Sequence, residues 1–177
     1  MDTVAQRIDK MNVTVTSPDG NIRATLVNRN RIGLEFRSGA YEAYAKPSIE
    51  HQLERLALLL WSGYRKGYNA ILNDGRSDRP ERRTVVPRDE AQRRFYQAVS
   101  EIHVRAKSPS QVVRMQTIGM QRWKVRLSDD ALTLPELRFG QEVLQAGGDV
   151  LNRFRGRIAQ LKEEHFGYSF VKQRARR

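Results

Sequence analysis

Residues 12–36 read NVTVTSPDGNIRATLVNRNRIGLEF, and a related pattern returns at residues 103–127 as HVRAKSPSQVVRMQTIGMQRWKVRL. A shift of 91 positions aligns Val13 with Val104, Ser17-Pro18 with Ser108-Pro109, Val27 with Ile118, Leu34 with Val125 and Phe36 with Leu127. Few residues are identical, but the order of apolar positions and one turn recur. Self-similarity at a fixed spacing is the signature of repeated structural units. We therefore predict two copies of one unit.

Each copy contains three short segments in which apolar and polar residues alternate. Val13 and Val15 begin the first copy, the turn Ser17-Pro-Asp-Gly20 follows, and two further alternating runs end at Phe36. Alternation over four to eight residues is typical of a half-buried strand, and Pro and Gly in this order favour a tight reversal. We expect three antiparallel strands per copy, the second set at residues 102–106, 112–117 and 122–127.

Helical patterns flank both sets of strands. Residues 3–10 and 90–101 predict short leading helices, and residues 48–72 carry apolar side chains at spacings of three, four and seven, which is typical of an amphipathic helix. Thr133 and Glu136 have the spacing of a capping box before a second long helix reaching about residue 164. The predicted fold class is α+β, with two tandem αβββα units that each combine a three-stranded antiparallel sheet with a long amphipathic helix and that form a pseudo-dimer.

The two long helices differ where glycine occurs. In the 91-residue register Gly63 and Gly67 align with Phe154 and Ile158, and Gly147 aligns with Leu56. Because glycine inside a helix costs about 0.5 to 1 kcal/mol relative to alanine, we expect these positions to be holes that receive large side chains of the other copy. The candidate interface residues are Leu53, Leu56, Leu60, Leu144, Gly147, Leu151, Phe154 and Ile158.

Charge and the repeat together suggest how the chain is divided. The chain holds 32 Lys and Arg against 20 Asp and Glu, for a formal net charge of +12, and no cysteine. We assign residues 1–75 to the first unit, 76–89 to a basic linker, 90–166 to the second unit and 167–177 to a basic tail. Such a positive excess favours polyanionic partners through counterion release and long-range attraction.

Basic residues outside the apolar pattern are the candidate nucleic-acid contacts. Guanidinium groups suit phosphates because their donors form a planar fork. The candidates lie in the turn before the third strand, in the first long helix, in the linker, in the second leading helix and in the tail. They are Arg29, Arg31, Arg65, Lys66, Arg82, Arg83, Arg93, Arg94, Lys172, Arg174, Arg176 and Arg177.

Catalytic and metal-binding patterns are missing from the sequence. It contains no P-loop, no HExxH, no GxSxG and no GxGxxG. Its histidines, His51, His103 and His165, stand in different predicted elements. No apolar run approaches the roughly 20 residues that span a bilayer, and the first residues have no apolar core of a secretory signal. We expect a cytoplasmic protein that is not an enzyme and uses no cofactor or metal and no membrane.

The leading helix, the strands opening with VTVTSPDG and the long helix resemble the YbaB/EbfC family of small nucleoid-associated proteins, over residues 1–72 and, more distantly, 91–166. Members of that family are homodimers of single αβββα units that bind DNA with little sequence preference. The resemblance implies a nucleoid protein that contacts the phosphate backbone of DNA. Relatives of this fold linked to specialised secretion imply an alternative, a chaperone or scaffold whose helix at residues 137–161 receives a partner helix or which assembles as a homo-oligomer.

Overall fold

The computed structural model describes residues 3–28, 31–74 and 89–167. The first unit consists of α1 (Val4–Asp9), β1 (Asn12–Thr16), β2 (Ile22–Val27), β3 (Arg31–Phe36) and α2 (Lys46–Asp74). The second consists of α3 (Glu90–Ser100), β4 (His103–Lys107), β5 (Val113–Ile118), β6 (Arg122–Leu127), the 3-10 helix η1 (Ala131–Thr133) and α4 (Glu136–Phe166). This is an α+β fold.

The 91-residue register holds at every strand. β1, β2 and β3 shift onto the bounds of β4, β5 and β6 without an insertion, and the two sheets have the same antiparallel order, β1-β2-β3 and β4-β5-β6. The cross-strand partners shift as well, since Ile22 pairs with Phe36 and Val113 pairs with Leu127. The prediction of two related αβββα units is confirmed.

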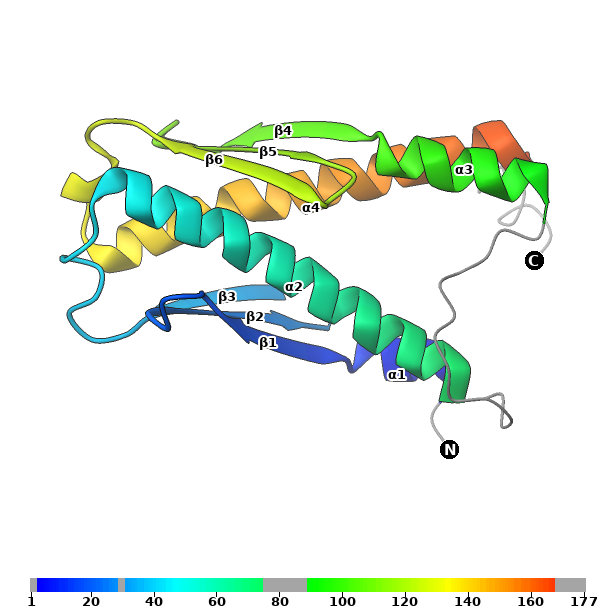
Figure 1. Ribbon diagram of the computed structural model, residues 1–177, viewed down its shortest axis with the longest axis horizontal. Coiled ribbons are helices and arrows are strands. Elements are labelled where there is room, and N and C mark those ends of the chain that lie inside the picture. The colour runs from blue at the N-terminus through cyan, green and yellow to red at the C-terminus, as the bar shows by residue number, and fades with distance from the viewer. Residues whose placement is uncertain (1–2, 29–30, 75–88, 168–177) are drawn as a thin grey trace, which may run out of the picture.

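The two long helices lie between the two sheets, with one sheet on each outer side (Figure 1). α2 packs on β1 and β2 of its own unit and also on β6 of the other unit. α4 packs on β4 and β5 and also on β3. Each helix therefore contacts both sheets, which gives the pseudo-dimer a shared core and leaves the outer face of each sheet to solvent.

Alternation along the strands supplies that core. In β2 the buried residues are Ile22, Ala24 and Leu26, and in β5 they are Val113, Met115 and Thr117. From the helices, Ile49 and Phe139 are among the side chains fully removed from water. Burial of one such apolar side chain contributes roughly 1.5 to 3 kcal/mol, so the pattern that predicted the strands also accounts for the joining of the units.

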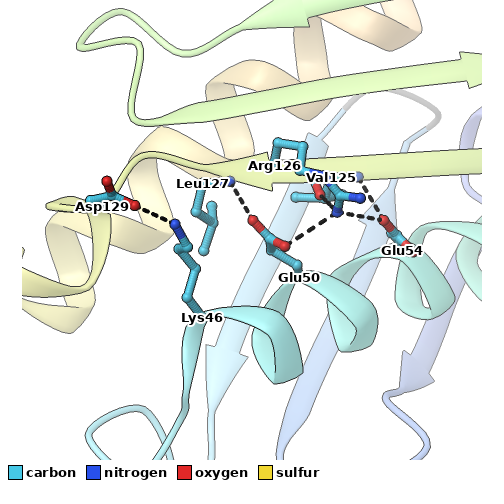
Figure 2. Close-up of polar contacts among 7 residues, drawn as sticks. All are labelled: Lys46, Glu50, Glu54, Val125, Arg126, Leu127 and Asp129. Carbon is cyan, nitrogen blue, oxygen red and sulfur yellow. Dashed lines mark hydrogen bonds and ion pairs between the residues drawn. The ribbon is translucent and has the colours of Figure 1, made fainter.

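Polar contacts join α2 to the edge of the second sheet (Figure 2). The backbone N–H of Leu127 donates to Glu50 at 2.8 Å, and that of Val125 donates to Glu54 at 3.0 Å. Arg126 lies 3.2 Å from the Glu50 carboxylate and 3.8 Å from that of Glu54. An edge strand presents unpaired backbone groups, and here two carboxylates of the other unit satisfy them. Lys46 and Asp129 add an exposed ion pair.

The first turn of each unit is built differently. Gly20 has a φ of +75°, and Gln111, its counterpart, has a φ of +61°. In the first unit Asp19 accepts hydrogen bonds within the turn from Ser17 and the backbone of Asn21. The second unit has Ser110 in place of Asp19, and its turn is held by another carboxylate, described next.

Glu142 of α4 supplies the carboxylate for the second turn. Its two oxygens accept from the Ser110 backbone N–H at 3.1 Å and the Ser110 hydroxyl at 2.8 Å, and Arg138 lies 3.4 Å away. Burial raises the pKa of Glu142, but hydrogen bonds from Ser108 and Ser110 and the charge of Arg138 outweigh it, so the net pKa is lowered. Glu142 is therefore an ionised group in a buried site.

Two details differ from the sequence-based expectations. Thr133 does not cap α4, because it lies in η1 and its hydroxyl donates to the Asp130 carbonyl, while Pro135 is the N-cap residue. The expected capping box is wrong because the chain turns through η1 before the helix starts.

The glycine holes also have different partners. A Cβ on Gly63 would lie 2.7 Å from Val13, and one on Gly67 would lie 2.6 Å from Met11. A Cβ on Gly147 would approach only Met115, at 4.0 Å. All three contacts are within one unit, so the expectation that these glycines receive side chains of the other copy is wrong. In α2 the glycines allow a close approach to β1.

Candidate nucleic-acid interface

The outward side of the second sheet carries six basic residues. In β4, β5 and β6 every second residue is buried, so the alternate positions face solvent. Six of those nine positions hold exposed Lys or Arg, namely Arg105, Lys107, Arg114, Arg122, Lys124 and Arg126, and the other three hold His103, Gln116 and Ile118. We refer to these six residues as the basic face. No Asp or Glu occurs in the three strands, all of whose residues the structure describes.

The strand register arranges the basic face in rows. Lys107 pairs with Arg114, and Arg114 pairs with Arg126, so three cations lie side by side across the sheet. In the next row Arg105 and Lys124 flank Gln116. Like charges directly opposite on a sheet destabilise it. Because Glu50 and Glu54 compensate Arg126, the pair Lys107 and Arg114 is the part of the row that lowers the stability of the fold and that an anionic ligand would relieve.

Most of this charge has no internal partner. Of the six residues only Arg126 forms an ion pair with a carboxylate among the residues that the structure describes, through Glu50 and Glu54. The other five present their charges to solvent. No Phe, Tyr or Trp side chain lies on this side, since Trp123 points inward and the exposed ring is the imidazole of His103. With one small ring and many cations, the face suits a phosphate backbone.

The outer side of the first sheet is different. Its exposed charged residues are Arg23, Arg31 and Glu35, and Arg23 lies 3.9 Å from Glu35. The remaining outward positions hold Asn, Thr, Val or Gly. The two related sheets therefore differ strongly in charge, and because they lie on opposite sides of the helices (Figure 1) the basic face marks one side of the molecule.

The structure distributes the sequence-predicted basic residues over several elements. Arg31 is exposed on β3, and Arg65 and Lys66 are exposed on α2. Arg93 and Arg94 are exposed on α3, where both pair with Glu90, at 3.8 and 2.9 Å. None of these five belongs to the basic face. Seven candidates lie outside the described residues: Arg29, Arg82, Arg83, Lys172, Arg174, Arg176 and Arg177.

The predicted interface residues do meet at the junction of the units. An apolar cavity of about 100 Å³ lies there, and six of the eight residues line it: Leu53, Leu56, Leu60, Leu144, Gly147 and Leu151. Phe154 packs edge-on against Trp61 of the other unit at 5.7 Å, and Ile158 is half-buried against the core.

Sequence reasoning missed the basic face. We used the alternation in residues 103–127 only to find inward apolar residues, although the complementary positions Arg122, Lys124 and Arg126 gave a clear signal. Charges at every second residue of a strand lie on one side of the sheet. Reading both sides of the alternation would have found the face.

Other kinds of site have less support. Among the described residues no three His, Cys, Asp or Glu side chains gather in a way that could hold a metal ion. None of the helices in that part of the chain is long and apolar enough to cross a membrane. Comparisons with family models, with curated proteins and with solved structures give no match.

Proposed function

We propose that this chain is a non-enzymatic protein that binds double-stranded DNA through its phosphates, with the basic face of the second sheet as the main contact surface. The observation that carries the proposal is the row Lys107–Arg114–Arg126, in which like charges are held opposite one another. On this proposal the protein acts at the nucleoid in the cytoplasm, as the resemblance to the YbaB/EbfC family implies.

Three features support duplex DNA as the partner. Five of the six cations have no carboxylate partner among the described residues. The spacing is set by a rigid sheet, so the charges are already in place before binding. The outward side of β4, β5 and β6 has no Phe, Tyr or Trp and a single imidazole, His103, which favours backbone contact over stacking of single-stranded bases. Little sequence preference follows, because phosphates carry no base identity.

The test uses fluorescence anisotropy of a labelled duplex at several salt concentrations. If each of the five cations without a carboxylate partner contacts one phosphate, log affinity against log salt has a slope of about −4.5. The variant Arg105→Gln/Lys124→Gln removes two contacts and reduces that slope by about 2. The matched control Arg23→Gln/Arg37→Gln removes the same charge from the first unit and keeps the wild-type slope. Equal slopes for the two variants, or no binding at low salt, would contradict the proposal.

The alternative function, a scaffold that receives a partner helix along residues 137–161, has less support. Most apolar side chains of that segment, including Phe139, Val143, Val150 and Phe154, are already buried within the chain, and the exposed one is Leu137 at its start. A partner helix would have to displace one of the sheets. Recovery of one defined protein partner after nuclease treatment, together with a failure to bind duplex DNA, would favour this alternative.

A further inference from the structure

β1 is the outer strand of the first sheet, and among the residues that the structure describes its outer edge is not paired with another strand (Figure 1). The backbone N–H of Ser17 donates to the Ile22 carbonyl, and hydrogen-bonded pairs alternate along an antiparallel ladder. The backbone groups that therefore point away from β2 belong to Asn12, Thr14 and Thr16. In the described part of the chain, β2 and α2 are the elements with extensive contacts to β1. The free edge is thus a template for another strand.

The corresponding edge of the second sheet is protected by charge, whereas this edge is not. In the 91-residue register Thr14 corresponds to Arg105 and Thr16 to Lys107. Natural sheets protect an open edge with charged side chains, with proline or with a bulge. β1 has none of these, because its sequence is NVTVT and it pairs with β2 residue by residue. The two related sheets therefore share one kind of edge, and only the second sheet guards it against pairing.

We propose that β1 pairs with β1 of a second copy of this chain, in antiparallel orientation about a twofold axis at Thr14. Thr14 then faces Thr14 of the second copy and Asn12 faces Thr16, so the free backbone groups find partners in up to about six hydrogen bonds. No like charges meet along this seam, and Thr–Thr pairs across strands are favourable. The product is one continuous sheet with the strand order β3-β2-β1-β1-β2-β3.

The helix that lies on β1 fits the same arrangement. A Cβ on Gly63 would lie 2.7 Å from Val13, the neighbour of Thr14, so Gly63 marks the part of α2 nearest the twofold axis. Leu59 and Lys66 are exposed on one side of α2, before and after Gly63. The twofold relation places Leu59 of one copy beside Lys66 of the other, whose methylene stem would cover it. Leu59 is 41% exposed in the single chain. This match uses only residues of the chain itself, which favours a second copy over an unrelated strand.

The pairing is separate from the basic face. That face belongs to the second sheet, on the other side of the helices (Figure 1). Because the twofold axis is perpendicular to the first sheet, the two basic faces of the dimer lie on one side of it. Association of the chain with itself is measured without DNA, so its failure would leave the proposed function untouched.

The chain contains no cysteine, which allows a direct test of the register. In Thr14→Cys the two new residues face each other with Cα atoms about 5.5 Å apart, within the range of a disulfide. The matched control is Thr16→Cys, because Thr16 of one copy lies about 14 Å along the seam from Thr16 of the other. Under mild oxidation, Thr14→Cys should form a covalent dimer about tenfold faster than Thr16→Cys, since its thiols are held together by the pairing. Equal rates on a non-reducing gel would overturn the proposed pairing.

Sedimentation equilibrium at micromolar to submillimolar concentrations measures association of the unmodified chain, for which we expect a reversible monomer–dimer equilibrium. Thr14→Arg/Thr16→Lys transfers the charges of β4 to β1 and should weaken dimerisation about tenfold, because like charges then meet at the seam. The matched control Gln141→Arg/Gln145→Lys adds the same charge at exposed positions of α4 and should dimerise as the wild type does.

Thr14→Pro is a second variant, which serves if the charged one does not fold. Proline is tolerated on an edge strand whose N–H faces solvent, and it removes one donor from the free edge, so dimerisation should weaken here as well. A wild-type chain that stays monomeric at every concentration, or folded β1 variants that dimerise as tightly as the wild type, would overturn the proposal.

Discussion

Glu50 on α2 accepts a hydrogen bond at 2.8 Å from the backbone N–H of Leu127 on β6, although 77 positions separate the two residues in the chain. This contact ties the helix of one unit to the sheet edge of the other. It has no copy in the other half of the pseudo-dimer, because the residue equivalent to Glu50 is Gln141, which is exposed. The polar contacts between the two related units are therefore not symmetric.

The first prediction concerns this contact. Glu50→Ala leaves the Leu127 N–H buried without an acceptor, and we expect the free energy of unfolding to fall by about 2 kcal/mol. Urea denaturation measures the change. The control is Gln141→Ala, whose free energy of unfolding should stay within about 0.5 kcal/mol of the wild-type value, as is usual for surface substitutions. Equal effects of the two substitutions would show that the carboxylate does not matter to the junction.

The second prediction compares two glycines. Gly63→Ala places a Cβ 2.7 Å from Val13 Cγ1, and valine is stiff at χ1, so we expect a loss of about 1 kcal/mol or more from overpacking. In Gly147→Ala the new Cβ would approach only Met115, at 4.0 Å. The free energy of unfolding should therefore rise by about 0.5 to 1 kcal/mol, the helix preference of alanine over glycine. Thermal unfolding of both variants checks the opposite signs. A gain for Gly63→Ala would mean that α2 does not approach β1 closely.

The repeat and the strands could be predicted from the sequence, because each strand leaves a local mark. The apolar positions from Val13 to Phe36 recur 91 residues later in the same order, and the observed cross-strand partners follow that order. Burial of one side of a sheet forces this alternation. A strand can therefore be predicted from the alternation within about six consecutive residues.

The contacts between the units have no comparable local pattern in the sequence. Nothing near Glu50 in the sequence indicates that its carboxylate satisfies the backbone of β6, because that donor becomes available only when the two sheets have assembled around the helices. The turn that contains Gln111 is similar, since the neighbouring Ser110 donates its hydrogen bonds to Glu142 of a distant helix. The basic face, in contrast, could have been predicted from the sequence. Its cations occupy the polar positions of the alternation within each strand, which is a local pattern.

The third prediction is a pH dependence at Glu142. Its pKa in the folded protein lies below the ordinary value of 4.5, so the ionised form stabilises the fold above pH 4.5, and that stabilisation is lost as the pH falls through the lowered pKa. Stability should therefore fall more steeply below pH 4.5 in wild type than in Glu142→Gln, which cannot be protonated there. Urea unfolding over a series of acidic buffers measures this. Parallel curves for the two proteins would contradict the assignment.

The last prediction separates stability from binding on the basic face. Arg114 lies opposite Lys107, which has no carboxylate partner among the described residues, and opposite Arg126, which Glu50 and Glu54 compensate. Arg114→Gln therefore removes one uncompensated like-charge pair and should raise the free energy of unfolding by about 0.2 to 1 kcal/mol at low salt. The gain should shrink at about 1 M salt, where the screening length is only about 3 Å. The control is Arg105→Gln, because Arg105 faces Gln116 and has no cation directly opposite. Both variants lose one phosphate contact and should weaken duplex binding similarly, whereas only Arg114→Gln should become more stable. If the two variants have the same stability at low salt, the row of cations carries no cost, and the main support for an anionic ligand on this face is removed.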